Sequence, residues 1–209
     1  MKNVTDRTSN PFGMSPPCER FVPGYGDANA DFHLIGNHPG IHGGSETGIP
    51  FTNAAGRRLF SVLAAVDFLD APESNAPVPE NLFCSYLHLC VVDGEPSPAS
   101  YADCERFFDA ELRAIGAHVL LPVGERATEH VIQTYTAREV PTPLDMDALH
   151  ATEIRGSGWL VVPIKEPAEW AADEADRLNE SLRTLLDSDY RRETDLGRFL
   201  PGGDTYLVR

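Results

Sequence analysis

The stretch that decides the fold of this 209-residue chain runs from Gly36 to Leu59 and reads GNHPGIHGGSETGIPFTNAAGRRL. Just before it, Asp31–Gly36 (DFHLIG) carries apolar side chains and stops at a glycine, which is typical of a buried strand. The glycine-rich loop is followed by Ala54–Leu69, where apolar residues recur at helical spacing. The order of strand, glycine-rich loop and helix indicates one unit of a parallel α/β sheet.

The same alternation of strands and helices continues along the chain. We expect a strand at Asn81–Cys90, a helix at Ala99–Ile115, a strand at Ala117–Pro122, a helix at Glu125–Tyr135, a strand at Trp159–Ile164 and a helix at Asp173–Asp187. This pattern predicts an α/β fold with three layers (αβα) around a central, mostly parallel four-stranded sheet. The domain would occupy residues 31–190, after an irregular lead-in at 1–30 and before a polar C-terminal tail at 191–209. Such sheets bind ligands beyond the carboxyl ends of their strands.

The charge of the chain is strongly negative. Asp and Glu outnumber Lys and Arg by 32 to 17, which gives a net charge of −15, and Lys2 and Lys165 are the only lysines. This composition is typical of a halophilic protein, whose acidic surface stays hydrated where salt reduces the Debye length to about 3 Å. An ordinary acidic protein is the alternative. In dilute buffer such a surface would repel a phosphate backbone, so composition alone does not indicate nucleic-acid binding.

Membrane association and secretion are not expected. No run of about 18 apolar residues occurs, and Met1 is followed by the polar stretch KNVTDRTSNPFG. We therefore expect a soluble, cytoplasmic protein with no membrane partner, and a monomer.

The loop motif resembles the first motif of the uracil-DNA glycosylase superfamily, especially the iron–sulfur branch called family four. That family's loop runs G-E-x-P-G, a short acidic spacer, E-T-G-x-P-F and a glycine-containing helix start. The matching residues here are Gly36, Pro39, Gly40, Glu46, Thr47, Gly48, Pro50, Phe51 and Gly56. The likeness spans about residues 18–187, although only this motif is specific. It implies the superfamily's fold and recognition of uracil or another deaminated base flipped out of DNA.

The resemblance also assigns a base pocket. Phe51 matches the phenylalanine that stacks on the flipped base, and Gly36, Pro39 and Gly40 border it. Tyr86 stands where family four has an asparagine that binds the uracil edge. For Phe51, simple core packing is the alternative interpretation.

The positions at which the family performs chemistry are replaced. Asn37 stands where family four has Glu, and the next residue, His38, occupies the position at which the mismatch-specific branch uses an Asn. Either side chain can orient a water molecule, although an Asn cannot act as a general base at neutral pH. Glu166 replaces the His that donates to the departing base, unless it is a solvated turn residue. We predict Asn37, His38 and Glu166 as catalytic residues; a metal site at His38 and His42 is the alternative for the histidines.

Three further residues are candidates for DNA contact. Arg57 and Arg58, at the start of the first helix, would touch phosphates or merely balance the acidic surface. Trp170 lies where the family's loop enters the duplex, but it would equally well pack on the last helix.

The cysteines bear on the question of a cofactor. Family four holds a [4Fe–4S] cluster with two pairs of cysteines, one near the N-terminus and one around the turn after the second strand. Cys90 and Cys104 match the second pair. Cys18 matches one cysteine of the first pair, and Ser15 stands where the other would be. Cys84 lies within a strand and would have to turn outward to substitute. We expect no cofactor, with the cluster as the alternative, and no structural disulfide, because the chain carries no secretory signal.

Three functions compete. The first is a glycosylase that hydrolyses the N-glycosidic bond of uracil or a related deaminated base in DNA repair. The second is a weak or inactive relative that binds DNA or a nucleotide in the same pocket. The third is a hydrolase of small nucleosides, which the acidic surface favours.

Overall fold

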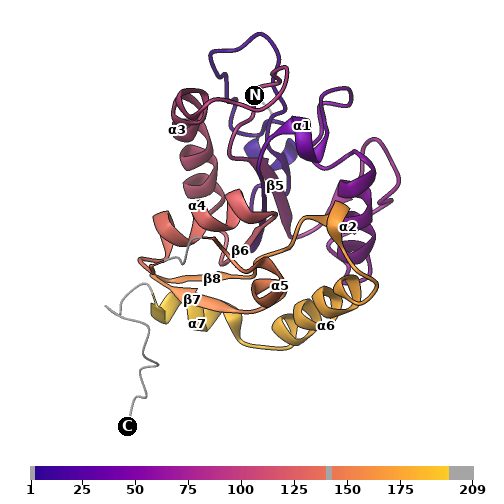
Figure 1. The fold of residues 1–209 in the computed structure, drawn as a ribbon, viewed down its shortest axis with the longest axis vertical. Coiled ribbons are helices and arrows are strands. Elements are labelled where there is room, and N and C mark those ends of the chain that lie inside the picture. The colour runs from indigo at the N-terminus through magenta and orange to yellow at the C-terminus, as the bar shows by residue number, and fades with distance from the viewer. Residues whose placement is uncertain (1–2, 140–142, 198–209) are drawn as a thin grey trace.

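The computed structural model describes residues 3–139 and 143–197. Its strands are β1 (Tyr25–Gly26), β2 (Phe32–Gly36), β3 (Leu69–Asp70), β4 (Val78–Pro79), β5 (Leu82–Tyr86), β6 (Val119–Pro122), β7 (Ile154–Gly156) and β8 (Trp159–Val161). Its helices are η1 (Val4–Asp6), α1 (Pro39–His42), α2 (Ala54–Ala64), α3 (Pro98–Ile115), α4 (Glu125–Tyr135), α5 (Met146–Leu149), η2 (Pro167–Glu169), α6 (Glu174–Leu186) and α7 (Tyr190–Gly197). Figure 1 shows their arrangement.

The main sheet contains the four predicted strands at its centre. Its order is β1-β5-β2-β6-β8-β7, and β5, β2, β6 and β8 run parallel to one another. The sheet has six strands instead of four, because the short strands β1 and β7 add antiparallel edges. Strands of two or three residues are too short to show an alternating pattern, so the sequence did not reveal them. The lead-in at 1–30 is therefore not wholly irregular.

Helices cover both faces of this sheet, which confirms the three layers. On one face, α2 and α6 pack on inward side chains such as Leu34 and Leu121. On the opposite face, α3 and α4 pack on Ile35 and Leu120. Adjacent residues of one strand thus face different cores, because side chains alternate along a strand. In Figure 1 the two helix pairs stand on opposite sides of β6 and β8.

The C-terminal region begins with a helix instead of a polar tail. The Tyr190 hydroxyl of α7 donates a 3.0 Å hydrogen bond to Asp31, and Arg191 forms an ion pair with the same carboxylate. The Thr194 hydroxyl also lies 2.6 Å from Nδ1 of His118. These contacts hold α7 against the residues that precede β2 and β6. The rest of the predicted tail, residues 198–209, lies outside the described residues.

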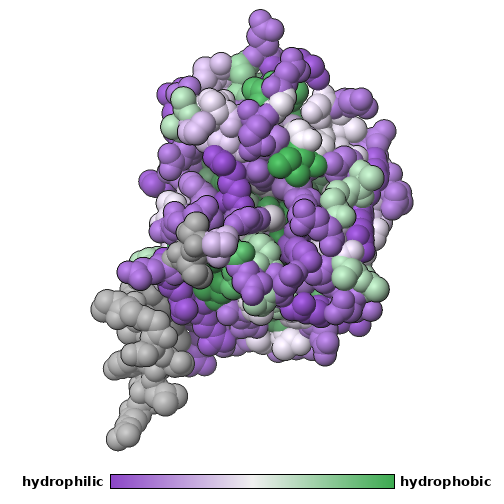
Figure 2. All heavy atoms as spheres, viewed as in Figure 1, coloured by the Kyte–Doolittle hydropathy of each residue, from purple (hydrophilic) through white to green (hydrophobic). Residues whose placement is uncertain are grey.

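The surface is predominantly polar. Figure 2 shows hydrophilic side chains over most of one face, with only separate apolar spots. Among the described residues, the large apolar side chains that are exposed are Ile41, Val78 and Val92. No described helix is long and apolar enough to cross a membrane.

One buried carboxyl group makes a testable contribution to stability. Glu111 of α3 is 4% exposed, and burial raises its pKa from 4.5 to about 8, although the Gly24 backbone opposes the shift. Between these two pH values the unfolded chain is ionised at this group while the folded protein retains the proton. Folding stability contributed by this site therefore falls as pH rises from about 4.5 to 8 and changes little above that.

We expect Glu111→Gln to remove this dependence. Relative to the native protein, the variant should gain stability steadily from pH 5 to 8, on the order of a few kcal/mol. Urea unfolding at several pH values measures the difference, with the exposed Glu105→Gln as control. A difference between Glu111→Gln and the native protein that stays constant with pH would contradict the assignment.

Candidate functional site

A cavity of about 780 Å³ lies at the carboxyl ends of β2, β6 and β8. The residues that line it come from the segments after β2, β5, β6 and β8, from the start of α4, from α5 with the residues just before it, and from η2. They are Asn37, Ile41, His42, Glu95, Val123, Gly124, Glu125, Arg126, Glu129, Leu144, Asp145, Met146, Asp147, Lys165, Glu166 and Glu169. The cavity therefore brings together two of the three predicted catalytic residues, Asn37 and Glu166.

Asn37 follows β2 directly and is held in place by three hydrogen bonds. Its amide oxygen accepts a hydrogen bond from the Tyr101 hydroxyl of α3. Its backbone N–H donates to Nδ1 of His42 at 3.1 Å, and its carbonyl accepts from the His88 N–H at 3.0 Å. Because the amide oxygen is engaged by Tyr101, the side chain has its NH₂ group left to offer a ligand as a donor.

His42 and Glu166 form a hydrogen-bonded pair at the wall of the cavity. Nε2 of His42 lies 2.9 Å from Oε2 of Glu166. Since Nδ1 of His42 accepts the Asn37 N–H, the ring proton sits on Nε2 and is donated to the carboxylate. The second carboxylate oxygen, Oε1, is buried and has no hydrogen-bond partner among the described residues. Glu166 is thus oriented by a histidine and retains one acceptor, which is not the behaviour of a solvated turn residue.

A glycine makes room for this carboxylate. Gly124 precedes α4 with φ +81°, and a Cβ atom built there would lie 3.3 Å from Oε2 of Glu166. A side chain at this position would be strained by its backbone conformation as well as crowded by the carboxylate.

His38 lies beside the site but is not among the residues that line the cavity. It caps α1, since its Nδ1 accepts the Gly40 N–H at 3.1 Å, and Pro39 takes the first helical position. Burial lowers the pKa of His38, although Glu95, 3.7 Å away, acts in the opposite direction. The metal site considered for His38 and His42 has no support in this geometry, because both ring nitrogens of His42 are engaged within the protein.

Phe51 and Tyr86 lie behind the cavity wall. Phe51 is fully buried, with φ +61°, and its ring stacks on that of His42 at a centroid distance of 5.1 Å. The Tyr86 hydroxyl accepts the Phe51 N–H at 2.8 Å and donates to the Gly43 carbonyl at 2.9 Å. Gly36 permits this packing, because a Cβ atom there would approach both rings within 2.7 Å. His42 consequently separates Phe51 from the cavity in this conformation.

The three residues considered for DNA contact all have intramolecular partners. Arg57 donates to the carbonyls of Glu73 and Ser74, and Arg58 donates to the carbonyls of Pro167 and Trp170. The Trp170 side chain is 6% exposed, and its Nε1 donates to the Lys165 carbonyl at 2.8 Å. The Arg58 contacts join α2 to the loop after β8, which carries Glu166, whereas the Arg57 contacts join α2 to the segment between β3 and β4.

The cavity has an acidic lining. Among the described residues, seven carboxylate side chains line it, against two basic ones, Arg126 and Lys165. Lys165 pairs with Asp147 at 2.6 Å and with Glu174 at 2.9 Å, and these carboxylates raise its pKa. Arg126 lies over the Tyr101 ring at 3.7 Å. At low salt the site therefore disfavours an approaching phosphate.

The cysteines do not behave as expected. Cys18 and Cys90 form a disulfide, which corrects the prediction of no structural disulfide. The prediction relied on the lack of a recognisable secretory signal. In the structure, a β-bridge between Phe21 and Cys90 brings the lead-in against the loop after β5, and Cys18 thereby comes within bonding distance of Cys90. Cys104 lies 3.7 Å from Cys90, but Cys84 is buried in the separate core beneath α2. Four cysteines for a [4Fe–4S] cluster are therefore not assembled.

Two residues take part in the site in roles that were not predicted. His42 lies in the quoted motif, and only its contact with Glu166, 124 positions later, shows its part in the site. Tyr101 lies in the predicted helix Ala99–Ile115, and its hydroxyl reaches Asn37. Neither contact follows from sequence spacing, because each joins segments that only the tertiary fold brings together.

Comparisons with known proteins agree with this architecture. The family model described as the uracil DNA glycosylase superfamily matches residues 23–187. A type-5 uracil-DNA glycosylase of Thermus thermophilus is 31% identical over 138 residues, which cover 63% of either chain. A type-4 enzyme of Saccharolobus solfataricus is 23% identical over 173 residues, covering 82% of this chain and 73% of the relative.

A type-5 uracil-DNA glycosylase of Mycobacterium bovis is 26% identical over 141 residues, covering 63% of this chain and 52% of the relative. The chain thus spans about half to three quarters of the length of these curated relatives. The family match covers most of the chain and coincides with the αβα domain and its cavity. The chain belongs to the uracil-DNA glycosylase superfamily.

Proposed function

We propose that this protein is a DNA glycosylase that hydrolyses the N-glycosidic bond of uracil or another deaminated base. The observation that carries the proposal is the convergence of Asn37 and Glu166 on one cavity at the carboxyl ends of the strands. Superfamily membership and the similarity to type-4 and type-5 uracil-DNA glycosylases support the reaction class.

The hydrogen bonds suggest how the two residues share the reaction. Glu166, held by His42, would accept a proton from a water molecule in the cavity through its carboxylate as the water oxygen bonds to the sugar C1′. The bond from C1′ to the base nitrogen breaks, and its electron pair leaves with the base. The Asn37 amide would donate to an oxygen of the departing base and stabilise the developing negative charge. These roles reverse those expected from the sequence alone.

The base pocket remains part of the proposal. The loop residues Gly36, Pro39 and Gly40 would border the flipped base, and His42 lies between Phe51 and the cavity. A flipped base would accordingly stack on the His42 ring, with Phe51 supporting that ring from behind. Tyr86 would act by holding the loop and not by reading the base.

The acidic lining points to the working conditions. A duplex carries many phosphates, and seven carboxylates at the cavity oppose its approach unless salt screens them. We therefore propose a monomeric cytoplasmic enzyme adapted to high salt, whose partner is DNA that contains the damaged base and which needs no cofactor for the reaction.

The proposal is tested with purified protein and oligonucleotides that contain a single uracil, hypoxanthine or xanthine, in single and double strands. Alkali then cleaves any abasic site. We expect strand breaks that increase as salt rises from dilute to molar, and that are lost in Asn37→Ala. If no strand breaks appear with any of these bases at any salt concentration, the proposal that the protein is a glycosylase is refuted.

The replacement of the family's Glu and His by Asn37 and Glu166 favours a second candidate, a relative that binds DNA or a nucleotide without catalysis. The same oligonucleotides, labelled with a fluorophore, distinguish it. Anisotropy would rise with a base-dependent affinity while no strand is cleaved.

A further inference from the structure

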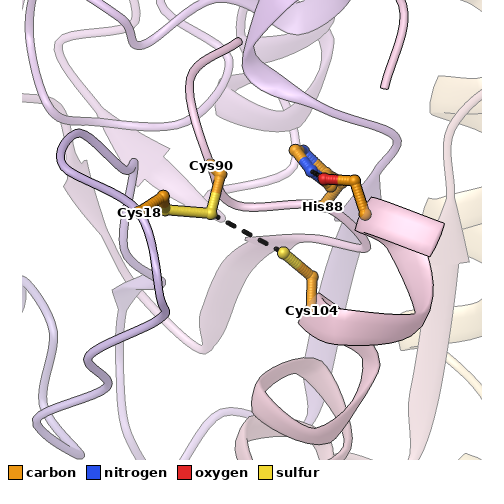
Figure 3. Close-up of a disulfide and its surroundings, with 5 residues drawn as sticks. Cys18, His88, Cys90 and Cys104 are labelled. Atoms are coloured by element: carbon orange, nitrogen blue, oxygen red, sulfur yellow. Dashed lines mark hydrogen bonds between the residues drawn. A yellow bond between two sulfur atoms is a disulfide. The ribbon is translucent and has the colours of Figure 1, made fainter. Parts of the chain in front are cut away.

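A second group of reactive side chains lies outside the cavity, where the lead-in meets the loop after β5 and the helix α3. It contains Cys18 from the lead-in, His88 and Cys90 from the loop, and Cys104 from α3. Figure 3 shows the three sulfur atoms next to one another, with His88 beside them. Four residues that can serve as metal ligands, from three segments of the chain, thus lie close together.

The distances in this group suit one metal ion and not a cluster. Zn–S bonds are about 2.3 Å long, so two sulfurs at corners of a tetrahedron around zinc lie about 3.8 Å apart. The sulfurs of Cys90 and Cys104 are separated by 3.7 Å. A ring nitrogen of His88 and these two sulfurs all lie within 4.8 Å of one another. A [4Fe–4S] cluster places four iron atoms among its thiolates and needs more room and a fourth cysteine.

His88 has the arrangement of a metal-binding histidine. The residue is fully buried, and its Nδ1 has no hydrogen-bond partner among the described residues. Its Nε2 lies 2.6 Å from the Ser100 hydroxyl. Ligating histidines are usually oriented in this way, through a hydrogen bond from the nitrogen that does not bind the metal.

The surroundings would protect such a site from water. Leu89, Phe21 and Phe107 pack around Cys90 and Cys104 in a separate small core. The remaining cysteine, Cys84, is 1% exposed in a different core, so it is available as a control and not as a ligand.

We propose that Cys18, His88, Cys90 and Cys104 bind a single tetrahedral Zn²⁺ ion once the Cys18–Cys90 disulfide is reduced. A thiol or phosphine reductant supplies two electrons, and with two protons the disulfide becomes two thiols. Zinc then binds three sulfurs as thiolates and releases their three protons. The disulfide and the metal are alternative ways of tying the lead-in to the sheet.

Backbone hydrogen bonds connect the proposed metal site to the loop that carries Asn37 in the neighbouring cavity. The His88 N–H donates to the Asn37 carbonyl at 3.0 Å, and the Val22 N–H donates to the Leu89 carbonyl at 2.8 Å. Metal binding to the folded state alone would therefore stabilise the lead-in and the loop that carries Asn37.

The test uses the full chain, reduced with a phosphine, freed of metal and then titrated with Co²⁺ or Zn²⁺. We expect one ion per chain, a tetrahedral thiolate spectrum with Co²⁺ that Zn²⁺ abolishes, and a higher melting temperature. Cys104→Ser and His88→Gln should lose the tetrahedral spectrum, whereas Cys84→Ala should retain it. Ser100→Ala should weaken binding by about 10- to 100-fold, because it removes the group that orients His88.

Circular dichroism of each reduced variant checks that it is folded; if one unfolds, the remaining ligand variant provides the comparison. The proposal is overturned if the reduced native chain retains no zinc after gel filtration. It is equally overturned if Cys104→Ser and His88→Gln both keep the native Co²⁺ spectrum, or if anaerobic reconstitution with iron and sulfide yields a four-iron cluster.

Discussion

Glu166→Gln should lower the rate of base excision by about 100-fold or more, as expected when a general base is removed. The substitution keeps the shape of the side chain, and the Gln carbonyl oxygen can still accept the proton of His42 Nε2 at the position now occupied by Oε2. What it removes is the ability of the carboxylate to take a proton from water. Binding of the damaged DNA should change little, so the loss belongs to the chemical step.

The measurement is a single-turnover time course with excess protein, on the base and at the salt concentration at which the native protein is most active. Glu180→Gln, an exposed change of the same charge on α6, should leave the rate unaltered. If Glu166→Gln excises the base within about twofold of the native rate, other groups perform the reaction. Loss of a general base would lower the rate by about 100-fold or more.

The second large effect is expected from Tyr86→Phe. The change removes one hydroxyl and deprives both the Phe51 N–H and the Gly43 carbonyl of their partner. The ring is 1% exposed, so water does not readily replace the lost hydrogen bonds. Leaving buried polar groups unsatisfied costs about 1 to 3 kcal/mol each, and we expect the free energy of unfolding to fall by roughly 2 to 4 kcal/mol.

Urea unfolding measures this loss, with Tyr25→Phe as a matched control. The Tyr25 hydroxyl donates a 2.7 Å hydrogen bond to the Pro77 carbonyl, and removal of this single bond should cost about 1 kcal/mol. The relative excision rates for uracil and hypoxanthine should be unchanged in Tyr86→Phe. A change of base preference without loss of stability would instead assign Tyr86 to reading the base.

Part of the site could be predicted from the resemblance to the motifs of the family. Asn37 and Glu166 were identified because they stand where the resembling family has its Glu and its His, and both line the cavity. His38 was chosen for its place in the motif, but it caps α1 beside the cavity. The position of a residue in a motif places its backbone, whereas the rotamer and the neighbouring segments decide where its side chain lies.

What the sequence by itself determined is the layered α/β architecture and its family. Apolar periodicity is a local property, so it located the central strands and helices, and the loop motif identified the superfamily. The helix predicted to reach Leu69 was too long, because α2 ends at Ala64 and Leu69 begins β3. Only the tertiary structure decided the edge strands, the His42–Glu166 pair and the meeting of Cys18, Cys90 and Cys104. Each of these depends on contacts between distant segments, and such contacts form only when burial of the two cores brings the segments together.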